Sequence, residues 1–273
     1  MKTTTKAMLL LGAAAIAAGA FSEKLTLRSY PIRSSKITSP IKLLQISDLH
    51  SSLYGKNQNE LITFTDRISP DAILLTGDIL DNRTPNSNAL HYLKYVGAKY
   101  PCYYVSGNHE VYTHFLTEIK DLLRHYGITV LEGESVSVTL NGQTISVSGV
   151  DDPYVCMDNK GRLWEEQVKE CSENVDEKVF SILLSHRPEQ VATYSDSNFD
   201  LVLAGHAHGG QVIIPYFVNG LFAPHQGIIP PYAGGKYQLE NGKTMIVSRG
   251  LSKLVRPRVF NRPEAVLVTL LPE

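Results

Sequence analysis

Carboxylates, an asparagine and histidines follow five apolar stretches of this chain, each at the point where a predicted strand ends. In residues 201–208, an apolar run stops at Gly205 and is followed by His206 and His208. Side chains two residues apart face the same way in extended backbone, and imidazole is the commonest side-chain metal ligand. This pattern therefore predicts metal binding. The complete set of predicted ligands is Asp48, His50, Asp78, Asn108, His186, His206 and His208, with His109 beside them.

The elements that must position these residues alternate between strands and helices. Strands are predicted over 41–46, 72–76, 102–106, 179–185 and 201–205, and helices over 59–69, 88–96, 113–126 and 161–175. This alternation favours an α/β fold with a largely parallel sheet. Two hairpin patterns, with Asn-Gly turns at 141–142 and 241–242, favour a second and more antiparallel sheet.

Ligand sites in open α/β sheets lie beyond the carboxyl ends of the strands, so the five motifs are expected to converge. Seven ligands are too many for one metal ion and suit two. Because carboxylate, amide oxygen and imidazole are all represented and no cysteine takes part, the set suits Mn, Fe or Zn better than a soft metal. The three cysteines lie far apart and form neither a disulfide framework nor a zinc motif.

The order of the motifs resembles that of the calcineurin-like metallophosphoesterase superfamily over residues 41–210. The matching positions are Asp48-x-His50, Gly77-Asp78, Gly107-Asn108-His109-Glu110, His186 and Gly205-His206-x-His208. Within the superfamily, the chain is similar to the membrane-associated bacterial metallophosphohydrolases. The resemblance implies a four-layer α/β fold, in which two packed mixed β-sheets are flanked by helices.

The resemblance also implies a role for each ligand. Asp48, His50 and His208 would hold one metal ion, and Asn108, His186 and His206 would hold the other. Asp78 would bridge the two divalent or mixed-valence ions together with a hydroxide, and that hydroxide would attack phosphorus directly. The positive charge of two divalent ions exceeds the negative charge of Asp48, Asp78 and one hydroxide. The site would therefore keep a net positive charge, which suits binding of a phosphate anion. His109 is the candidate to protonate the leaving oxygen or to stabilise the charge of the phosphoryl group.

These features predict a phosphoester hydrolase acting as a phosphodiesterase or pyrophosphatase. A phosphomonoesterase, including a protein phosphatase, is the alternative within enzymes, since the motifs do not separate these substrates. A non-catalytic protein-binding scaffold on the same fold, as in the retromer subunit, is the alternative of another class. The substrate is expected to be a phosphoester, lipid- or nucleotide-linked. The net charge of −1 gives no nucleic-acid signature.

The N-terminus differs from the rest of the chain. Lys2 and Lys6 precede residues 7–21, which carry no charge, so residues 1–22 are predicted to be a signal peptide or a membrane anchor. Residues 23–40 are expected to form a tether or edge segment, and residues 41–273 one metallophosphoesterase domain. The protein is therefore expected to be membrane-associated or exported, with its catalytic domain outside the cytoplasm.

Several further residues could contact substrate. His114 lies near the Asn-His motif, His225 lies in the Gly-, Pro- and aromatic-rich stretch 209–236, and Arg249 follows a strand. For Arg249 a surface ion pair is the equal alternative. The stretch 209–236 either closes the core, which is the favoured interpretation, or forms a pocket wall for an apolar substrate group. Glu110 is expected to orient its neighbours, and Asp81 and Asp152 to be turn residues.

Overall fold

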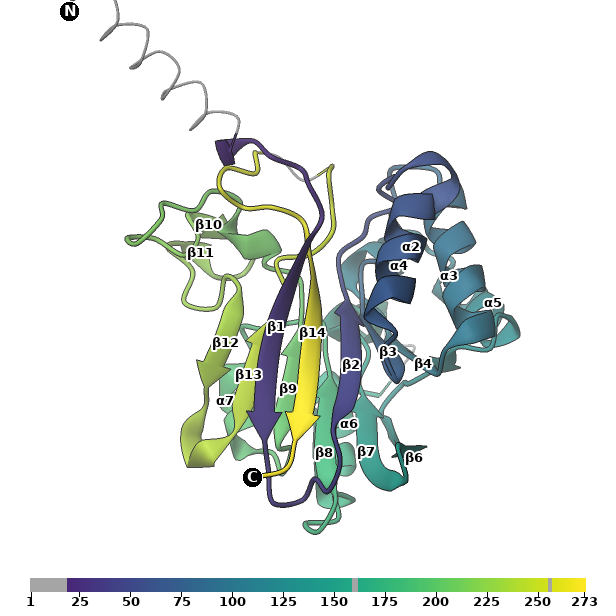
Figure 1. Cartoon of the computed structure of the whole chain (residues 1–273), viewed down its shortest axis with the longest axis vertical. Helices are drawn as coiled ribbons and strands as arrows, with labels where there is room; N and C mark the ends of the chain where they lie inside the picture. The colour runs from purple at the N-terminus through teal and green to yellow at the C-terminus, as the bar shows by residue number, and fades with distance from the viewer. Residues whose placement is uncertain (1–18, 159–161, 255–256) are drawn as a thin grey trace, which may run out of the picture.

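Two six-stranded sheets form the centre of the computed structural model, which describes residues 19–158, 162–254 and 257–273 (Figure 1). The first sheet has the order β1 (Thr26–Arg33), β14 (Glu264–Leu271), β2 (Ile41–Ile46), β3 (Ala72–Thr76), β4 (Cys102–Val105) and β5 (Thr129–Val130). The second has the order β12 (Gly235–Gln238), β13 (Thr244–Val247), β9 (Leu201–Ala204), β8 (Phe180–Leu184), β7 (Gln143–Gly149) and β6 (Glu134–Leu140). Strands β2 to β5 are parallel, as are β13, β9, β8 and β7.

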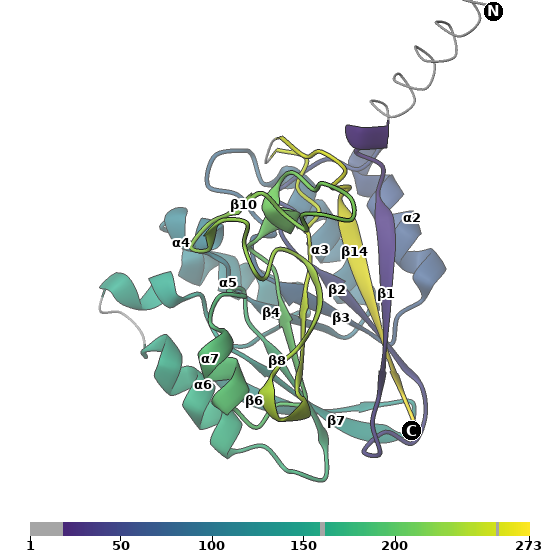
Figure 2. The same cartoon turned by 90° about the vertical axis from the view of Figure 1, so that its left-hand side faces the viewer.

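The two sheets pack face to face and are covered by helices on their outer sides. In β2, Leu43 joins the core between the sheets, whereas Leu44 faces the helices. The helices over the first sheet are α2 (Asn59–Ile68), α3 (Ser87–Lys99) and α5 (Leu116–His125). Those over the second are α6 (Trp164–Glu173) and α7 (Val191–Asp196) (Figure 2). All of β3 and β8 is buried, as expected for strands covered on both faces. The predicted four-layer fold of two mixed sheets flanked by helices is confirmed.

The segment before residue 41 includes the edge strand of the first sheet. Strand β1 pairs in parallel with β14 along its whole length, so residues 26–33 are an edge strand and not a tether. The predicted signal peptide or anchor lies almost entirely in residues 1–18, which are outside the described residues. Within the part of the chain that the structure describes, no helix is both long and apolar enough to cross a membrane.

Two local expectations are wrong. The helix predicted to begin at Thr113 begins instead at Leu116, as α5, because His114 adopts a positive φ of 62°, and a separate short helix, α4 (Asn108–Tyr112), precedes it. The stretch 209–236 does not simply close the core. It contains a short hairpin of β10 (Phe222–Ala223) and β11 (Gly227–Ile228), and although Ala223 packs on the core, Tyr216 and Phe217 are exposed.

Candidate metal centre

The five predicted motifs meet beyond the carboxyl ends of β2, β3, β4, β8 and β9. Their His and Asp side chains form two groups, and within each group the ligand atoms lie within 4.8 Å of one another. The first group comprises Asp48, His50, Asp78 and His208, and the second comprises Asp78, His186 and His206. Asp78 belongs to both groups, which is the arrangement that two neighbouring metal ions sharing one carboxylate would require.

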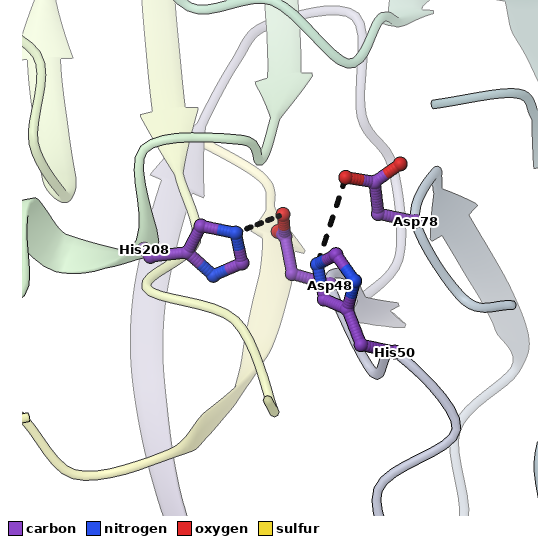
Figure 3. A group of neighbouring side chains, drawn as sticks. All are labelled: Asp48, His50, Asp78 and His208. Carbon is purple, nitrogen blue, oxygen red and sulfur yellow. Dashed lines mark ion pairs between the residues drawn. The ribbon is translucent and has the colours of Figure 1, made fainter. Parts of the chain in front are cut away.

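Figure 3 shows the first group, in which dashed lines join His208 to Asp48 and His50 to Asp78. Nε2 of His50 lies 3.6 Å from Oδ2 of Asp78, and Nε2 of His208 lies 3.6 Å from Oδ1 of Asp48. In the second group, Nε2 of His186 lies 3.2 Å from the same Oδ2 of Asp78. One oxygen of Asp78 therefore faces a histidine of each group.

The donor atoms of this site fit a metal. Nε2 of His50, Oδ2 of Asp78, Oδ1 of Asn108 and Nε2 of His186 are buried and have no hydrogen-bond partner among the described residues. Leaving a buried polar atom without a partner costs about 1–3 kcal/mol, so these unpartnered atoms call for a ligand. Nδ1 of His186 lies 2.8 Å from the carbonyl oxygen of Thr76, which can only accept, so Nδ1 carries a proton and Nε2 is the nitrogen left to bind a metal.

The protonation states of these residues mostly suit metal binding. Burial lowers the pKa of His50 to about 4 and holds the pKa of His206 and His208 well below the usual range, which keeps these three imidazoles neutral. Burial opposes ionisation of Asp78, yet the neighbouring His186 and His50 hold its pKa well below its usual range. His186 is the exception: burial opposes its charge, but Asp78 raises its pKa to about 10. A metal must therefore displace a proton there.

The backbone of the site is held in an uncommon conformation. Asp48, His50, Asp78, His206 and His208 all have positive φ values, between 45° and 66°. Non-glycine residues with positive φ are uncommon, and they cluster at functional sites where the surrounding structure enforces them. The loops therefore adopt a strained backbone conformation that orients these side chains toward the site.

Glu110 is one of the groups that enforce this shape. Its carboxylate is fully buried and accepts four backbone N–H bonds. Oε2 accepts from Asp78 and Gly107 at 2.9 and 3.0 Å, and Oε1 accepts from Ile79 and Leu80 at 2.7 and 3.0 Å. Glu110 thus ties the loop after β3 to the loop after β4, which supports its expected orienting role.

Glycines let the metal-binding loops approach one another. A Cβ on Gly107 would collide with the carboxylate of Asp78, and one on Gly205 would collide with Oγ of Ser47 and the carboxylate of Asp48. The carboxylate of Asp48 in turn accepts the backbone N–H of His206 at 3.0 Å. The glycine in each motif is therefore required by close packing against a predicted ligand.

His109 lies at the rim of the site. Its backbone N–H donates to Oδ1 of Asp78 at 2.8 Å, and its ring packs edge-on against His50, with centroids 4.4 Å apart. Nδ1 of His109 lies 2.9 Å from both Asp81 and Asn82. The imidazole is therefore oriented by a carboxylate while its side chain remains 20% exposed. Asp81 is more than the turn residue that the sequence suggested.

Only one of the three predicted substrate contacts joins this cluster. Nδ1 of His225 lies 3.0 Å from Nε2 of His206. The guanidinium of Arg249 instead lies 3.8 Å from Glu264, which is the ion-pair alternative. His114 lines a separate cavity of about 430 Å³ with Lys120 and Arg124 among its other lining residues.

Sequence reasoning missed an arginine beside the second group. Arg187 is 2% exposed, and its Nε and Nη2 donate to Asp152 at 2.5 and 3.0 Å. Its Nη1 lies 3.0 Å from Nε2 of His206 and 2.8 Å from Nδ1 of His225. This permanent cation opposes a further metal ion between those histidines, although Glu189, His206 and His225 are close enough to hold one. One signal was available in the sequence, since Arg187 directly follows His186; the parallel pairing of β7 with β8 that brings Asp152 to the same edge is visible only in the structure.

Comparisons with known proteins agree with this site. The calcineurin-like phosphoesterase family model matches residues 41–210, which include every predicted ligand. The chain is 31% identical over 271 residues to an uncharacterized metallophosphoesterase of Aquifex aeolicus, covering 94% of this chain and 97% of that protein. It is 30% identical over 247 residues to the uncharacterized protein YpbG of Bacillus subtilis, covering 89% and 85% of the two chains.

Solved structures share the fold at low identity. A 5'-nucleotidase precursor from Thermus thermophilus superposes with a TM-score of 0.53 at 16% identity, covering 85% of this chain and 54% of that one. This chain thus spans about half the length of that structure, and the likeness concerns the fold alone. The family match, the relatives and the clustered metal-binding side chains together show that the chain belongs to the calcineurin-like phosphoesterase family of metal-dependent phosphoester hydrolases.

Proposed function

We propose that this chain hydrolyses phosphodiester or pyrophosphate bonds with two bound ions of Mn, Fe or Zn. The observation that carries the proposal is that Asp78 is shared by two groups of buried ligand atoms. We assign the first ion to Asp48, His50 and His208, the second to Asn108, His186 and His206, and Asp78 to both.

When bound, two such ions supply Lewis acidity and an activated water for in-line displacement at phosphorus. The protein contributes the fixed geometry. Glu110 and the close-packed glycines hold the ligands, and the neutral state of His50, His206 and His208 leaves lone pairs for binding. Because the nucleophile is a water molecule and not a protein side chain, we propose no covalent phosphoenzyme.

His109 is proposed to protonate the leaving oxygen. It is oriented through Nδ1 by Asp81 and lies beside His50 at the rim, where a substrate would enter. We also assign Arg187 and His225, which lie beside His206 of the second group, to contact a phosphoryl oxygen or the substrate group beyond it. A lipid- or nucleotide-linked phosphoester is the proposed substrate class.

The test is to reconstitute the full chain with Mn, Fe or Zn and compare bis(p-nitrophenyl) phosphate with p-nitrophenyl phosphate. Faster hydrolysis of the diester supports the proposal, whereas faster hydrolysis of the monoester favours a phosphomonoesterase. A chain that binds two ions and cleaves neither ester, nor any of a panel of lipid and nucleotide phosphoesters, would instead favour a protein-binding scaffold. The Asp78→Asn variant is the control for hydrolysis by free metal.

A further inference from the structure

The loop over residues 211–230 exposes an unusual number of large apolar side chains; we call it the apolar loop. Of the fifteen exposed large hydrophobic side chains among the described residues, seven lie in it: Ile214, Tyr216, Phe217, Leu221, Phe222, Ile228 and Ile229. Tyr216 is fully exposed, and Phe217 and Ile228 are 85% and 76% exposed. Isolated exposed apolar residues are ordinary, but a cluster of this kind marks an interaction surface.

The exposure is built into an ordered loop. Strands β10 and β11 pair, the N–H of Ile214 donates to the carbonyl of Val218 at 2.9 Å, and the N–H of Leu221 donates to that of Gly210 at 2.9 Å. These hydrogen bonds hold the backbone of the loop in place. The apolar side chains are therefore exposed on an ordered backbone.

The apolar loop is continuous with the N-terminal end of the described chain. The N–H of Ile213 donates to the carbonyl of Val259 at 2.9 Å, and the N–H of Phe260 donates to that of Ala20 at 2.7 Å. Phe260 and Phe21 are themselves 40% and 65% exposed. Figure 1 shows β10, β11, the segment before β14 and the start of the described chain at one end of the molecule, opposite the C-terminus, and Figure 2 shows β10 and the start of the described chain at that end from another side.

The sequence that leads into this end is apolar as well. Residues 7–21 carry no charged side chain, and Lys2 and Lys6 precede them. This run leads directly into Ala20, whose carbonyl is bonded to Phe260 next to the apolar loop. A lipid bilayer is an environment that suits both the run and the loop.

Positive charge accompanies the apolar surface. Among the described residues, a cavity of about 290 Å³ beside Phe260 is lined by Arg28, Arg249 and Arg262 and by one carboxylate, that of Glu264, which lies 3.5 Å from Arg28 and 3.8 Å from Arg249. Arg28 and Arg262 are exposed, whereas Arg249 is mostly buried. Three guanidiniums against one carboxylate leave net positive charge, which suits the phosphate of an anionic lipid.

We propose that this end of the molecule docks on the surface of an anionic bilayer. Tyr216, Phe217 and Ile228 enter the boundary between headgroups and acyl chains, and Arg28 and Arg262 contact lipid phosphates. Apolar and aromatic side chains beside basic ones are the composition of interfacial membrane contacts. Docking of this end on a bilayer is a separate property from the proposed hydrolysis and does not depend on it.

The test measures the depth of the apolar loop in the full chain bound to vesicles. The chain has a single tryptophan, Trp164, which is buried in the core. A second tryptophan is placed by Phe217→Trp, and the matched control is Thr139→Trp, at an exposed position of the β6–β7 hairpin. Vesicles of phosphatidylcholine and phosphatidylglycerol with brominated acyl chains quench only tryptophans that reach the bilayer.

We expect Phe217→Trp to be quenched at least twofold more strongly than Thr139→Trp, with a blue-shifted emission. Equal quenching of the two variants would overturn the proposal. A blue shift of Phe217→Trp that appears without lipid and grows with protein concentration would also overturn it, in favour of contact with a second copy.

The charge contribution is tested with the same probe. Replacing phosphatidylglycerol by phosphatidylcholine should reduce the quenching of Phe217→Trp, and adding Arg28→Gln and Arg262→Gln should abolish that difference. Arg28 also lies 3.5 Å from the buried carboxylate of Glu264, so circular dichroism is used to confirm that each variant is folded, and quenching is compared below the thermal midpoint of every variant. Quenching that does not respond to lipid charge in the parent variant would refute the role of the arginines.

Discussion

Replacing Glu110 by glutamine should weaken both the fold and the metal centre, although it changes only one atom. Each carboxylate oxygen of Glu110 accepts two backbone N–H bonds: Oε2 from Asp78 and Gly107, and Oε1 from Ile79 and Leu80. In the Glu110→Gln variant, either amide orientation places an NH₂ donor against two N–H donors. Two buried hydrogen bonds are lost, and two buried donors remain unpaired.

The expected cost follows from that count. Each unpaired buried donor costs about 1–3 kcal/mol, so two cost about 2–6 kcal/mol. This is a large part of the roughly 5–15 kcal/mol that stabilises a typical domain. If the NH₂ group takes the place of Oε2, the backbone N–H of Asp78 loses its partner; if it takes the place of Oε1, those of Ile79 and Leu80 do. Either loss loosens the loop that carries Asp78, so the variant should also bind metal more weakly.

The assay combines a denaturant unfolding curve in excess metal with the metal content per chain after desalting. Glu177→Gln, the same chemical change at an exposed position, is the control and should stay within about 0.5 kcal/mol of wild type. If Glu110→Gln unfolds at the same denaturant concentration as Glu177→Gln and retains as much metal, the assigned role of Glu110 is wrong.

Other perturbations address the rest of the site. His109→Ala should leave the metal content near normal and lower turnover by about 100- to 10,000-fold, the usual contribution of a general acid, and unchanged turnover would remove it from the mechanism. Gly205→Ala should cost about 1–3 kcal/mol and lower metal content, because its methyl group collides with Asp48; a normal metal content would contradict this. Arg187→Met should cost about 3–5 kcal/mol by leaving buried Asp152 unpaired, and adding Asp152→Asn should recover part of the loss. Chelation should lower the thermal midpoint, since metal at 100 times its dissociation constant stabilises by about 2.7 kcal/mol, and an unchanged midpoint would argue against a tightly bound metal.

Much of the fold and the core of the site could be predicted because the pattern is local. An apolar run that ends at a polar ligand gives both the strand and the direction of its carboxyl end, and parallel strands bring those ends together. The six predicted Asp and His ligands lie together for this reason. The close approach of Gly205 to Asp48 explains why glycine belongs to the motif, but the sequence alone did not show which atoms it avoids.

The residues that were missed depend on long-range pairing. Asp152 follows a hairpin, so it was interpreted as a turn residue, yet β7 is also parallel to β8 and delivers Asp152 to the same edge as His186. Arg187 shows its role only once Asp152 and His206 are placed around it. The parallel pairing of β1 with β14 joins the two ends of the domain, which no local pattern reports.

The apolar loop shows that burial could not be predicted from hydropathy alone. Apolar composition usually indicates burial, and on that basis the stretch 209–236 was expected to close the core. Hydropathy does not say whether an apolar side chain packs inward or is held outward by its backbone. Tyr216 and Phe217 are held outward.

The most direct test of the shared-carboxylate metal centre is a crystal structure of the full chain grown with Mn²⁺, with anomalous scattering measured to locate the ions. We predict two peaks about 3.5–4 Å apart, with the carboxylate of Asp78 between them. A single peak, or two peaks of which only one contacts Asp78, would contradict this prediction.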